Sequence, residues 1–324
     1  MERTVVRVRA VGPAEVLTLE REETPLPGPG EVQVRQTAIG LNFIDVYFRS
    51  GLYPTALPFI PGQESVGVVT AVGAGVAIPI GARVASAGVP GAYATARVLP
   101  AERVVRVPDA IDDVTAAAIM LKGMTAEYLV RRCHRLEAGQ VVVVHAAAGG
   151  VGQLLCQWAR HLGATVIGVV GRPEKAALAR ASGAHHVVVL SEQKLVDEVK
   201  RLTGGRGVDV VYDSVGKDTI AASLDSLRPR GLLVSFGQSS GMPEPLALSS
   251  LGGARSLFVT RPSLHAYVHT RAELEESSAA LFDVVTRGVV KVSAPTTFPL
   301  SAVADAHRAL EQRKTTGSVV LLPG

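Results

Sequence analysis

Residues 141–152 read Val141-Val142-Val143-Val144-His145-Ala146-Ala147-Ala148-Gly149-Gly150-Val151-Gly152, a valine run that ends in a turn of small residues. Valine is stiff at χ1, and an uninterrupted apolar run is typical of a parallel strand that is covered on both faces. Apolar residues then recur at helical spacing over 153–162, and Gly163 supplies a C-terminal stop. The sequence therefore predicts a buried strand, a tight turn and a helix.

The turn has the chemistry of an anion site. Residues 149–152 offer backbone amides at a helix N-terminus, where the helix dipole favours negative charge. The dinucleotide fingerprint G-x-G-x-x-G appears here as Ala147-Ala148-Gly149-Gly150-Val151-Gly152, with alanine in the first position. A tight turn without a ligand is the alternative interpretation. The position of the turn between a strand and a helix favours a dinucleotide.

Length and composition indicate two ordinary domains. The chain has 324 residues, of which 47% are apolar, and this is enough for two cores. Its 33 Lys and Arg against 29 Asp and Glu give a net charge of +4, which favours anionic partners such as phosphorylated cofactors. No Lys/Arg run marks a nucleic-acid-binding face. Cys133 and Cys156 are too few for a disulfide scaffold or a four-cysteine zinc lobe.

The sequence shows no targeting or membrane segment. Residues 1–9 alternate charged and apolar side chains, as a strand does, and have no apolar signal-peptide core. No apolar stretch reaches the roughly 20 residues that span a bilayer. We therefore expect a cytoplasmic protein without membrane contact.

The first 110 residues are rich in short strands separated by Gly and Pro. Strands are predicted at 5–11, 31–38, 65–72, 82–86, 93–99 and 104–107. This close spacing favours a compact antiparallel barrel over alternating strands and helices. A polar segment at 40–54 interrupts the pattern, with more Asn, Asp, Tyr and Arg than a plain connector requires.

Strands and helices alternate from the valine run to residue 236, which predicts a doubly wound parallel sheet. Strands are predicted at 165–170, 186–190, 208–212, 231–236 and 256–260, and helices at 174–182, 195–202, 219–227, 271–287 and 300–312. The final strand, at 317–323, belongs to a tail that is too short to form a domain alone. We expect this tail to pack back on the N-terminal barrel.

The strand end at 168–175 indicates which dinucleotide is bound. An acidic residue near this position holds the ribose hydroxyls of NAD, whereas Gly171 and Arg172 stand here. Arg172 and Lys175 would attract a 2′-phosphate through charge-assisted hydrogen bonds, so NADPH is preferred over NADH. Glu174 opposes this interpretation unless it only serves the first turn of the next helix.

Five segments resemble the NADPH:quinone oxidoreductases, the zeta-crystallin-like, zinc-free branch of the medium-chain dehydrogenase/reductases. They are 38–45 (AIGLNFID), 49–54 (RSGLYP), 122–125 (KGMT), 145–152 (HAAAGGVG) and 260–263 (TRPS). The resemblance implies an α/β protein with a doubly wound parallel Rossmann sheet and a GroES-like β-rich catalytic domain. It implies an N-terminal catalytic part at 1–123, an NADPH-binding Rossmann domain at 124–262 and a C-terminal part at 263–324 that completes the catalytic domain.

The same resemblance locates the positions of the catalytic zinc ligands in zinc-dependent relatives. This chain fills them with Asn42, Gln63 and Lys122. Asn and Gln are not usual zinc ligands, and a lysine ammonium repels the ion, so we expect no metal. Without a Lewis acid to make an alkoxide, alcohol oxidation is disfavoured.

The resemblance also implies which residues contact the cofactor. The nicotinamide end is assigned to Asn42, Ile44 and Asp45, and the neighbouring wall to Thr125 and Tyr128. The pyrophosphate is assigned to Gly150 and Val151, the adenosine phosphate to Gly171, Arg172 and Lys175, the ribose and nicotinamide side to Phe236, Gly237, Gln238 and Ser239, and a returning arginine to Arg313. Leu190 stands where the family often has tyrosine, and leucine can cover the adenine with apolar surface but cannot donate a hydrogen bond.

We therefore expect hydride transfer from NADPH to a quinone. Tyr47 and Tyr53 either contact or protonate the acceptor oxygen, or only pack against their neighbours. Reduction of an α,β-unsaturated carbonyl compound is the nearest alternative, because it needs the same cofactor and geometry. His145 is interpreted as a buried structural residue.

A different class of function is RNA binding or a structural role, both of which are associated with relatives in this family. The sequence lacks the aromatic platform or basic stripe that RNA binding requires, so this interpretation ranks below the enzyme. A homodimer is expected from the resemblance, with 256–260 as an edge strand that could pair across it.

Overall fold

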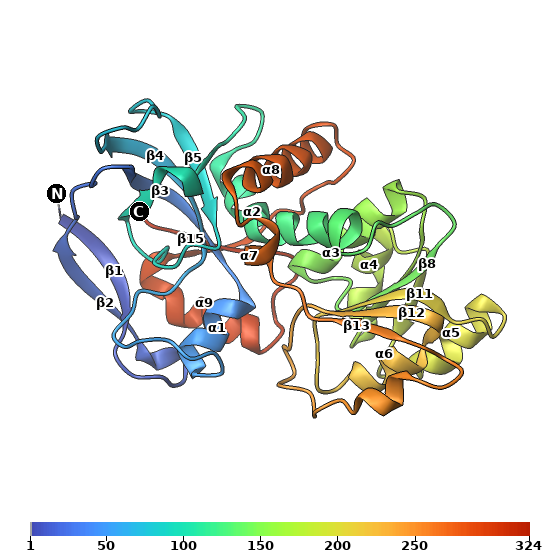
Figure 1. Ribbon diagram of the computed structural model, residues 1–324. Coiled ribbons are helices and arrows are strands. Elements are labelled where there is room, and N and C mark those ends of the chain that lie inside the picture. The colour runs from blue at the N-terminus through green and yellow to red at the C-terminus, as the bar shows by residue number, and fades with distance from the viewer. Residues whose placement is uncertain (1) are drawn as a thin grey trace. The chain divides into compact units, whose positions relative to one another are not determined.

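The computed structural model describes residues 2–324 and divides into two compact units (Figure 1). Unit 1 comprises 1–124, 268–286 and 292–324, and unit 2 comprises 125–267 and 287–291. The division falls inside helix α2 (Asp113–Tyr128), which a π-helical turn at Leu129–Cys133 follows. Within the described residues, no helix is long and apolar enough to cross a membrane.

Unit 2 is built on a six-stranded parallel sheet in the order β10-β9-β8-β11-β12-β13. The strands are β8 (Val141–Val144), β9 (Thr165–Val170), β10 (His186–Val189), β11 (Val208–Asp213), β12 (Leu227–Ser235) and β13 (Phe258–Thr260). This is the order of a doubly wound dinucleotide-binding sheet, in which the winding reverses between β8 and β11. The predicted α/β fold class with a Rossmann sheet is confirmed.

Helices cover both faces of this sheet (Figure 1). They are α3 (Gly150–His161), α4 (Ala176–Ala181), α5 (Leu195–Thr203) and α6 (Ile220–Asp225). Helices α3 and α4 pack on β8, β9 and β10, whereas α6 packs on β11 and β12 and contacts α5. Because both faces are covered, residues such as Val143, Ile167 and Val211 are fully buried.

Unit 1 contains the GroES-like part of the fold, a sheet in the order β14-β15-β3-β4-β5-β7, with β6 also paired to β3. Its strands are β3 (Glu31–Leu41), β4 (Glu64–Val72), β5 (Arg83–Ala87), β6 (Ala96–Pro100), β7 (Val105–Arg106), β14 (Thr296–Pro299) and β15 (Val319–Leu322). Most pairs are antiparallel, as predicted, but β14 runs parallel to β15. The C-terminal strand β15 pairs with β3, so the tail packs on the N-terminal sheet.

A two-stranded ribbon of β1 (Glu2–Val8) and β2 (Leu17–Glu23) accompanies this sheet. The prediction placed the first strand three residues too late and missed β2 altogether. The reason is that β2 carries three glutamates among its seven residues, and its charges are matched across the ribbon. Arg3 donates to Glu22 at 2.6 Å, and Arg7 donates to Glu20 at 2.7 Å. Opposite charges on facing strands thus replace the apolar alternation on which the prediction relied.

The polar segment at 40–54 contains helix α1 (Phe43–Ser50), which the sequence pattern did not predict. Its N-terminus is a capping box, in which the Asp45 carboxylate accepts from the Asn42 backbone amide at 2.9 Å. Gly51 ends the helix with φ +81°, a left-handed conformation that glycine adopts without strain. Unit 1 also contains α8 (Arg271–Thr286) and α9 (Val303–Glu311), and α7 (Leu264–Tyr267) belongs to unit 2.

Candidate cofactor and substrate site

The glycine turn of unit 2 lies at the end of β8, where it delivers the chain to the N-terminus of α3. Ala146 has φ +50°, and Gly149 is the N-cap residue. A Cβ atom at Gly152 would lie 2.2 Å from the Ala146 carbonyl oxygen, so only glycine permits this close approach of helix and strand. Gly150 and Val151 are half-buried and occupy the first helical positions, whose amides have no intrahelical acceptor. The turn therefore fits a dinucleotide pyrophosphate.

The residues assigned to the adenosine phosphate follow β9. Gly171 is exposed, and a Cβ atom there would meet no other atom within 4 Å. The Arg172 side chain is 77% exposed and lies 4.0 Å from Glu174, which is 63% exposed. An exposed pair of this kind is worth about 0–1 kcal/mol, so Glu174 does not prevent Arg172 from binding a phosphate. Lys175 ends the short 3-10 helix Pro173–Lys175 and is half-buried.

The loop after β12 contains the residues assigned to the ribose and nicotinamide side. It lies at the carboxyl edge of the sheet, where ligands of doubly wound folds bind. A Cβ atom at Gly237 would lie 2.7 Å from the Ser214 carbonyl oxygen, and Ser239 donates its backbone amide to that oxygen at 3.2 Å. Gln238 is buried and Phe236 is half-buried. The loops after β11 and β12 thus pack closely together.

Arg261 is a further residue of this edge that the predicted site left out. It follows β13, and its guanidinium donates to Gln238 Oε1 at 2.9 Å and to the Ser235 carbonyl oxygen at 3.2 Å. These bonds hold the loop after β12. The signal was present in the sequence, because an arginine directly after a predicted strand lies at the carboxyl edge of a parallel sheet.

His145 lies on the strand side of the glycine turn and is buried, as predicted. Its Nε2 atom is 2.9 Å from the Ser223 hydroxyl, which donates to Asp213 at 2.7 Å. Burial lowers the pKa of His145, and the charge of Asp213 opposes this shift. The contacts tie the end of β8 to β11 and α6, which indicates a structural role.

Thr125 and Tyr128, near the end of α2, are both buried. The Tyr128 ring stacks on the Tyr267 ring with a centroid distance of 4.4 Å and an interplanar angle of 8°. Burial raises the pKa of Tyr128, so its hydroxyl stays protonated. One face of the Tyr128 ring is therefore already occupied within unit 2.

Unit 1 holds a buried polar cluster of Asn42, Glu64 and Lys122, and two of its members, Asn42 and Lys122, stand at positions where zinc-dependent relatives have metal ligands. The Glu64 carboxylate is fully buried and accepts from Asn42 Nδ2 at 2.9 Å, Lys122 Nζ at 3.3 Å and the Leu121 amide at 2.6 Å. Sequence reasoning missed Glu64. The available signal was a carboxylate at the start of an otherwise apolar strand.

This donor set does not fit a zinc ion. Two of the three positions carry amides, Asn42 and Gln63, and the third carries the ammonium of Lys122, which Glu64 binds. Within residues 2–324, no group of three or more His, Cys, Asp or Glu side chains is arranged to hold a metal ion.

Asp45 lies three residues beyond Asn42, on α1, and is 1% exposed. Its Oδ2 atom accepts from the Asn42 amide at 2.9 Å and from the Tyr93 hydroxyl at 3.1 Å. Burial raises the pKa of Asp45 to about 7, although both hydrogen bonds and the charge of Lys122 oppose the shift. Asp45 also lines a cavity of about 250 Å³ in unit 1.

The two candidate substrate tyrosines contact each other. Tyr47 is 8% exposed, and its ring centroid lies 5.1 Å from that of the half-buried Tyr53. Ile44, one turn earlier on α1, is also half-buried. Both tyrosines therefore pack against an aromatic neighbour.

Arg313 and Leu190 lie at exposed positions. Arg313 follows α9 in unit 1 with φ +57°. Leu190 ends β10 in unit 2 and is 40% exposed, so its apolar surface is accessible at the strand end where the family often has tyrosine.

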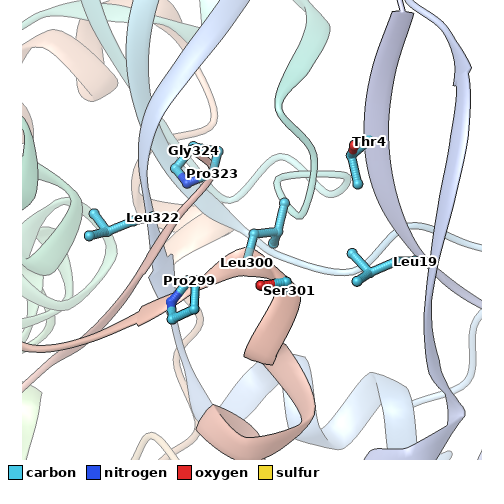
Figure 2. Close-up of a pocket in the computed structure, with 8 residues that line it drawn as sticks. All are labelled: Thr4, Leu19, Pro299, Leu300, Ser301, Leu322, Pro323 and Gly324. Atoms are coloured by element: carbon cyan, nitrogen blue, oxygen red, sulfur yellow. The ribbon is translucent and has the colours of Figure 1, made fainter.

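A second cavity of unit 1 has a volume of about 230 Å³ and lies against the C-terminus of the chain (Figure 2). None of the eight described residues that line it carries an ionisable side chain.

Comparison with known proteins gives consistent matches over the whole chain. Residues 28–109 match the family described as Alcohol dehydrogenase GroES-like domain, and residues 150–279 match the family described as Zinc-binding dehydrogenase. A quinone oxidoreductase of Pseudomonas aeruginosa is 48% identical over 321 residues, which are 98% of this chain and 99% of that protein. A 2-haloacrylate reductase of Burkholderia sp. is 48% identical over 306 residues, which are 92% of each chain.

Solved structures agree with these matches. The crystal structure of Escherichia coli quinone oxidoreductase complexed with NADPH has a TM-score of 0.97 at 45% identity, and the likeness covers 99% of this chain and 100% of that one. The fold and the glycine turn define a two-part, nucleotide-dependent oxidoreductase. The chain belongs to the quinone oxidoreductase family, and the resemblance seen in the sequence is confirmed.

Proposed function

We propose that the protein reduces quinones by hydride transfer from NADPH without a metal ion. The observation that carries this proposal is the glycine turn before α3, with Arg172 and Lys175 at the end of the neighbouring strand β9. Its likeness to a quinone oxidoreductase of Pseudomonas aeruginosa and to a quinone oxidoreductase structure complexed with NADPH supports it. NADPH supplies the hydride when bound, and the chain binds and orients both reactants.

The residues proposed to hold NADPH lie in both units. In unit 2, α3 faces the pyrophosphate through the amides of Gly150 and Val151, and the end of β9 binds the 2′-phosphate. The remaining proposed contacts are Thr125, Tyr128, Phe236, Gly237, Gln238 and Ser239 in unit 2, and Asn42, Ile44, Asp45 and Arg313 in unit 1. Tyr47 and Tyr53 are proposed to contact the acceptor.

The test of cofactor choice replaces the two cations by neutral side chains of similar length. The double variant Arg172→Gln, Lys175→Gln should bind NADPH about 10-fold or more weakly, because hydrogen bonds to charged groups contribute about 1.5–3 kcal/mol. Binding of NADH should change less than about 3-fold, as measured by cofactor fluorescence titration. Arg180→Gln, on the exposed side of α4, is the matched control. Equal losses for NADPH and NADH would show that these charges do not recognise the phosphate.

A second candidate reaction is the reduction of α,β-unsaturated carbonyl compounds, because a 2-haloacrylate reductase is 48% identical to this chain. Both reactions deliver a hydride to a conjugated acceptor. NADPH oxidation should be measured against benzoquinones, naphthoquinones and enones at equal concentrations. Turnover of the enones alone would exclude quinone reduction and would make the protein a reductase of α,β-unsaturated carbonyl compounds.

We further propose that the protein is a cytoplasmic homodimer. Strand β13 is an edge of the six-stranded sheet, and its Phe258 and Val259 are 60% and 37% exposed, which supports pairing with a second copy. In sedimentation-velocity ultracentrifugation, Phe258→Asp should shift the sedimentation coefficient from that of a dimer toward that of a monomer. His186→Asp, on the opposite edge strand β10, is the control. An unchanged dimer in the Phe258 variant would exclude β13 as the interface.

The proposed domains are 1–123, 124–262 and 263–324, and the division of the structure into units near residue 124 supports the first of these boundaries. Limited proteolysis with mass mapping would test them, since boundaries fall where few contacts cross. Cleavage confined to sites inside these ranges would contradict them.

A further inference from the structure

We propose that the Asp45 carboxyl group donates a proton to the oxygen atom of the reduced acceptor, and that Tyr93, His307 and Arg49 position it. The proposal rests on the proposed function, because it supplies the proton that quinone reduction consumes. It differs from the sequence-based expectation, in which Asp45 contacts only the cofactor and the tyrosines serve the acceptor.

The hydrogen bonds of Asp45 leave one of its oxygen atoms for the proton. Oδ2 accepts two bonds, from the Asn42 amide at 2.9 Å and from the Tyr93 hydroxyl at 3.1 Å. Oδ1 is buried and has no hydrogen-bond partner among the described residues. A buried carboxylate oxygen without a donor is costly, whereas a protonated Oδ1 is a donor that awaits an acceptor.

The hydrogen bond from the Tyr93 hydroxyl to Asp45 has a fixed direction, because Tyr93 is itself hydrogen-bonded to His307, which is hydrogen-bonded to Arg49. Arg49 Nη1 lies 3.2 Å from His307 Nδ1, and a guanidinium can only donate, so Nδ1 accepts. The proton of the neutral imidazole is therefore on Nε2, which donates to the Tyr93 oxygen at 3.0 Å. The hydroxyl proton of Tyr93 must then point to Asp45 Oδ2.

Two features fix the charged guanidinium of Arg49 and the neutral imidazole of His307 in this series of hydrogen bonds. Glu311 binds the Arg49 guanidinium through two bonds of 2.7 and 2.9 Å, which fixes the guanidinium against His307. Burial, together with the charge of Arg49, lowers the pKa of His307 to about 3, so the imidazole stays neutral near pH 7. These hydrogen bonds therefore orient Tyr93. They do not carry protons to solvent, because the last residue of the series, Arg49, only donates.

A cavity beside Asp45 can take the acceptor. Its volume is about 250 Å³, and Phe48, Phe59 and Ile60 give it apolar walls, with Gln63 as a polar neighbour. Drug-sized ligands occupy pockets of about 300–1,000 Å³, so this space suits a small one- or two-ring acceptor. An apolar pocket with a few convergent polar groups is the arrangement expected of a substrate site.

The charges that face Asp45 decide how its proton is held. Burial is the main cause that raises its pKa to about 7, and Glu64 on β4 adds to it. Lys122 on α2 and the Tyr93 hydroxyl lower it. Arg49, on the same helix, lies behind Tyr93 and His307. Near neutral pH the carboxyl group is therefore part protonated, which is the condition under which a general acid works best.

The step balances in atoms and electrons. A quinone that accepts a hydride gains two electrons and one hydrogen, and becomes a hydroquinone monoanion. The O–H bond at Asp45 Oδ1 breaks, and an O–H bond forms at the acceptor oxygen to give the neutral hydroquinone. Asp45 is left as a carboxylate, which regains a proton from water after the product leaves.

The test uses the full-length Asp45→Asn variant, whose amide oxygen still accepts from Asn42 and Tyr93. We expect kcat for 1,4-naphthoquinone, measured at saturating NADPH, to fall about 100-fold, within the range of general acid catalysis. The wild-type kcat should fall above about pH 7. This decline should be absent in the variant. Asp305→Asn, an exposed change on α9, is the matched control.

Three further measurements test the titration of Asp45, its positioning by Tyr93 and the cavity that takes the acceptor. Carbon-13 NMR of aspartate-labelled protein without cofactor should show a carboxyl group that titrates near pH 7 and is lost in Asp45→Asn. Tyr93→Phe should raise that pKa and move the alkaline limb of kcat to higher pH by the same amount, because it removes a bond to the charged form. Phe59→Trp, which fills the cavity, should raise KM for the quinone but leave the Kd for NADPH unchanged.

The outcomes distinguish this proposal from the proposed function. Wild-type kcat and pH dependence in Asp45→Asn, or an Asp45 carboxyl group that titrates near pH 4, would overturn the role of Asp45 while quinone reduction stands. If the wild-type protein fails to oxidise NADPH in the presence of every quinone and enone tested, the proposed function is overturned, whatever the NMR titration shows.

Discussion

Glu64→Gln removes the charge that holds the polar cluster of unit 1 together. The carboxylate is fully buried and accepts from Leu121, Asn42 and Lys122, whose ammonium is itself only 8% exposed. Breaking a buried ion pair by removing one partner costs about 3–5 kcal/mol, because the other charge stays buried. The glutamine oxygen can still accept from the Leu121 amide. We therefore expect a loss near the lower end of this range, about 3 kcal/mol.

The assay is thermal unfolding of the full-length protein, monitored by differential scanning calorimetry. For a domain of about 150–250 residues, each kcal/mol lowers Tm by about 2–4 °C, so the variant should lose about 6–12 °C. Glu275→Gln is the control within unit 1, since its pair with Arg271 is exposed and is worth about 0–1 kcal/mol.

A double-mutant cycle isolates the ion pair from other effects of the substitution. Lys122→Met removes the buried cation but leaves Glu64 with the donors of Leu121 and Asn42. The double variant Glu64→Gln, Lys122→Met should be more stable than the sum of the single losses predicts, by about 1–3 kcal/mol of coupling. A coupling near zero, with Glu64→Gln within about 1 kcal/mol of the wild type, would refute the reasoning that Glu64 stabilises Lys122.

Three further changes test other parts of the structure. Gly152→Ala should cost about 1–3 kcal/mol and weaken NADPH binding, because its Cβ would meet the Ala146 carbonyl oxygen at 2.2 Å; melting and fluorescence titration would check both. Burial raises the pKa of Asp209, but hydrogen bonds from two arginines and a backbone amide outweigh it and lower the pKa to about 2. The stability gained is present above about pH 4 and is lost as pH falls toward 2, so Asp209→Asn should show a shallower acid loss in urea titrations. Arg261→Ala should weaken NADPH binding about 10-fold by releasing Gln238, a loss of about 1.4 kcal/mol in fluorescence titration, and an unchanged Kd would exclude this role.

The sheet of unit 2 could be predicted closely because its strands are buried on both faces. Burial on both faces makes each strand a continuous apolar run, and β9 begins and ends at the predicted residues, Thr165 and Val170. The ribbon of unit 1 could not be predicted in the same way. Strand β2 is stabilised by arginine–glutamate pairs with β1, and charges that are matched across a ribbon are indistinguishable from a solvated loop in the sequence of one strand.

The candidate site divides along the same line. The glycine turn is local in sequence, so its spacing alone indicates a strand, a turn and a helix N-terminus. The series of hydrogen bonds that runs from Asp45 through Tyr93 and His307 to Arg49 is not local in sequence. Tyr93 follows Asp45 by 48 residues, and His307 follows Arg49 by 258. No periodicity connects such positions. Only the pairing of β15 with β3 and the packing of α9 in unit 1 bring these residues together.

The chemistry of the two polar clusters in unit 1 favours reduction of an acceptor over oxidation of an alcohol. Oxidation requires a group that stabilises an alkoxide, but the Lys122 ammonium is bound by Glu64, and Asn42 donates to the same carboxylate. Reduction of a quinone needs only a hydride and one proton, because the conjugated acceptor is already electrophilic. Asp45 is built for the second requirement, since burial favours its protonated form and Tyr93 orients it. The cluster of Asn42, Glu64 and Lys122 and the acid beside it thus favour the same class of substrate, a conjugated acceptor and not an alcohol.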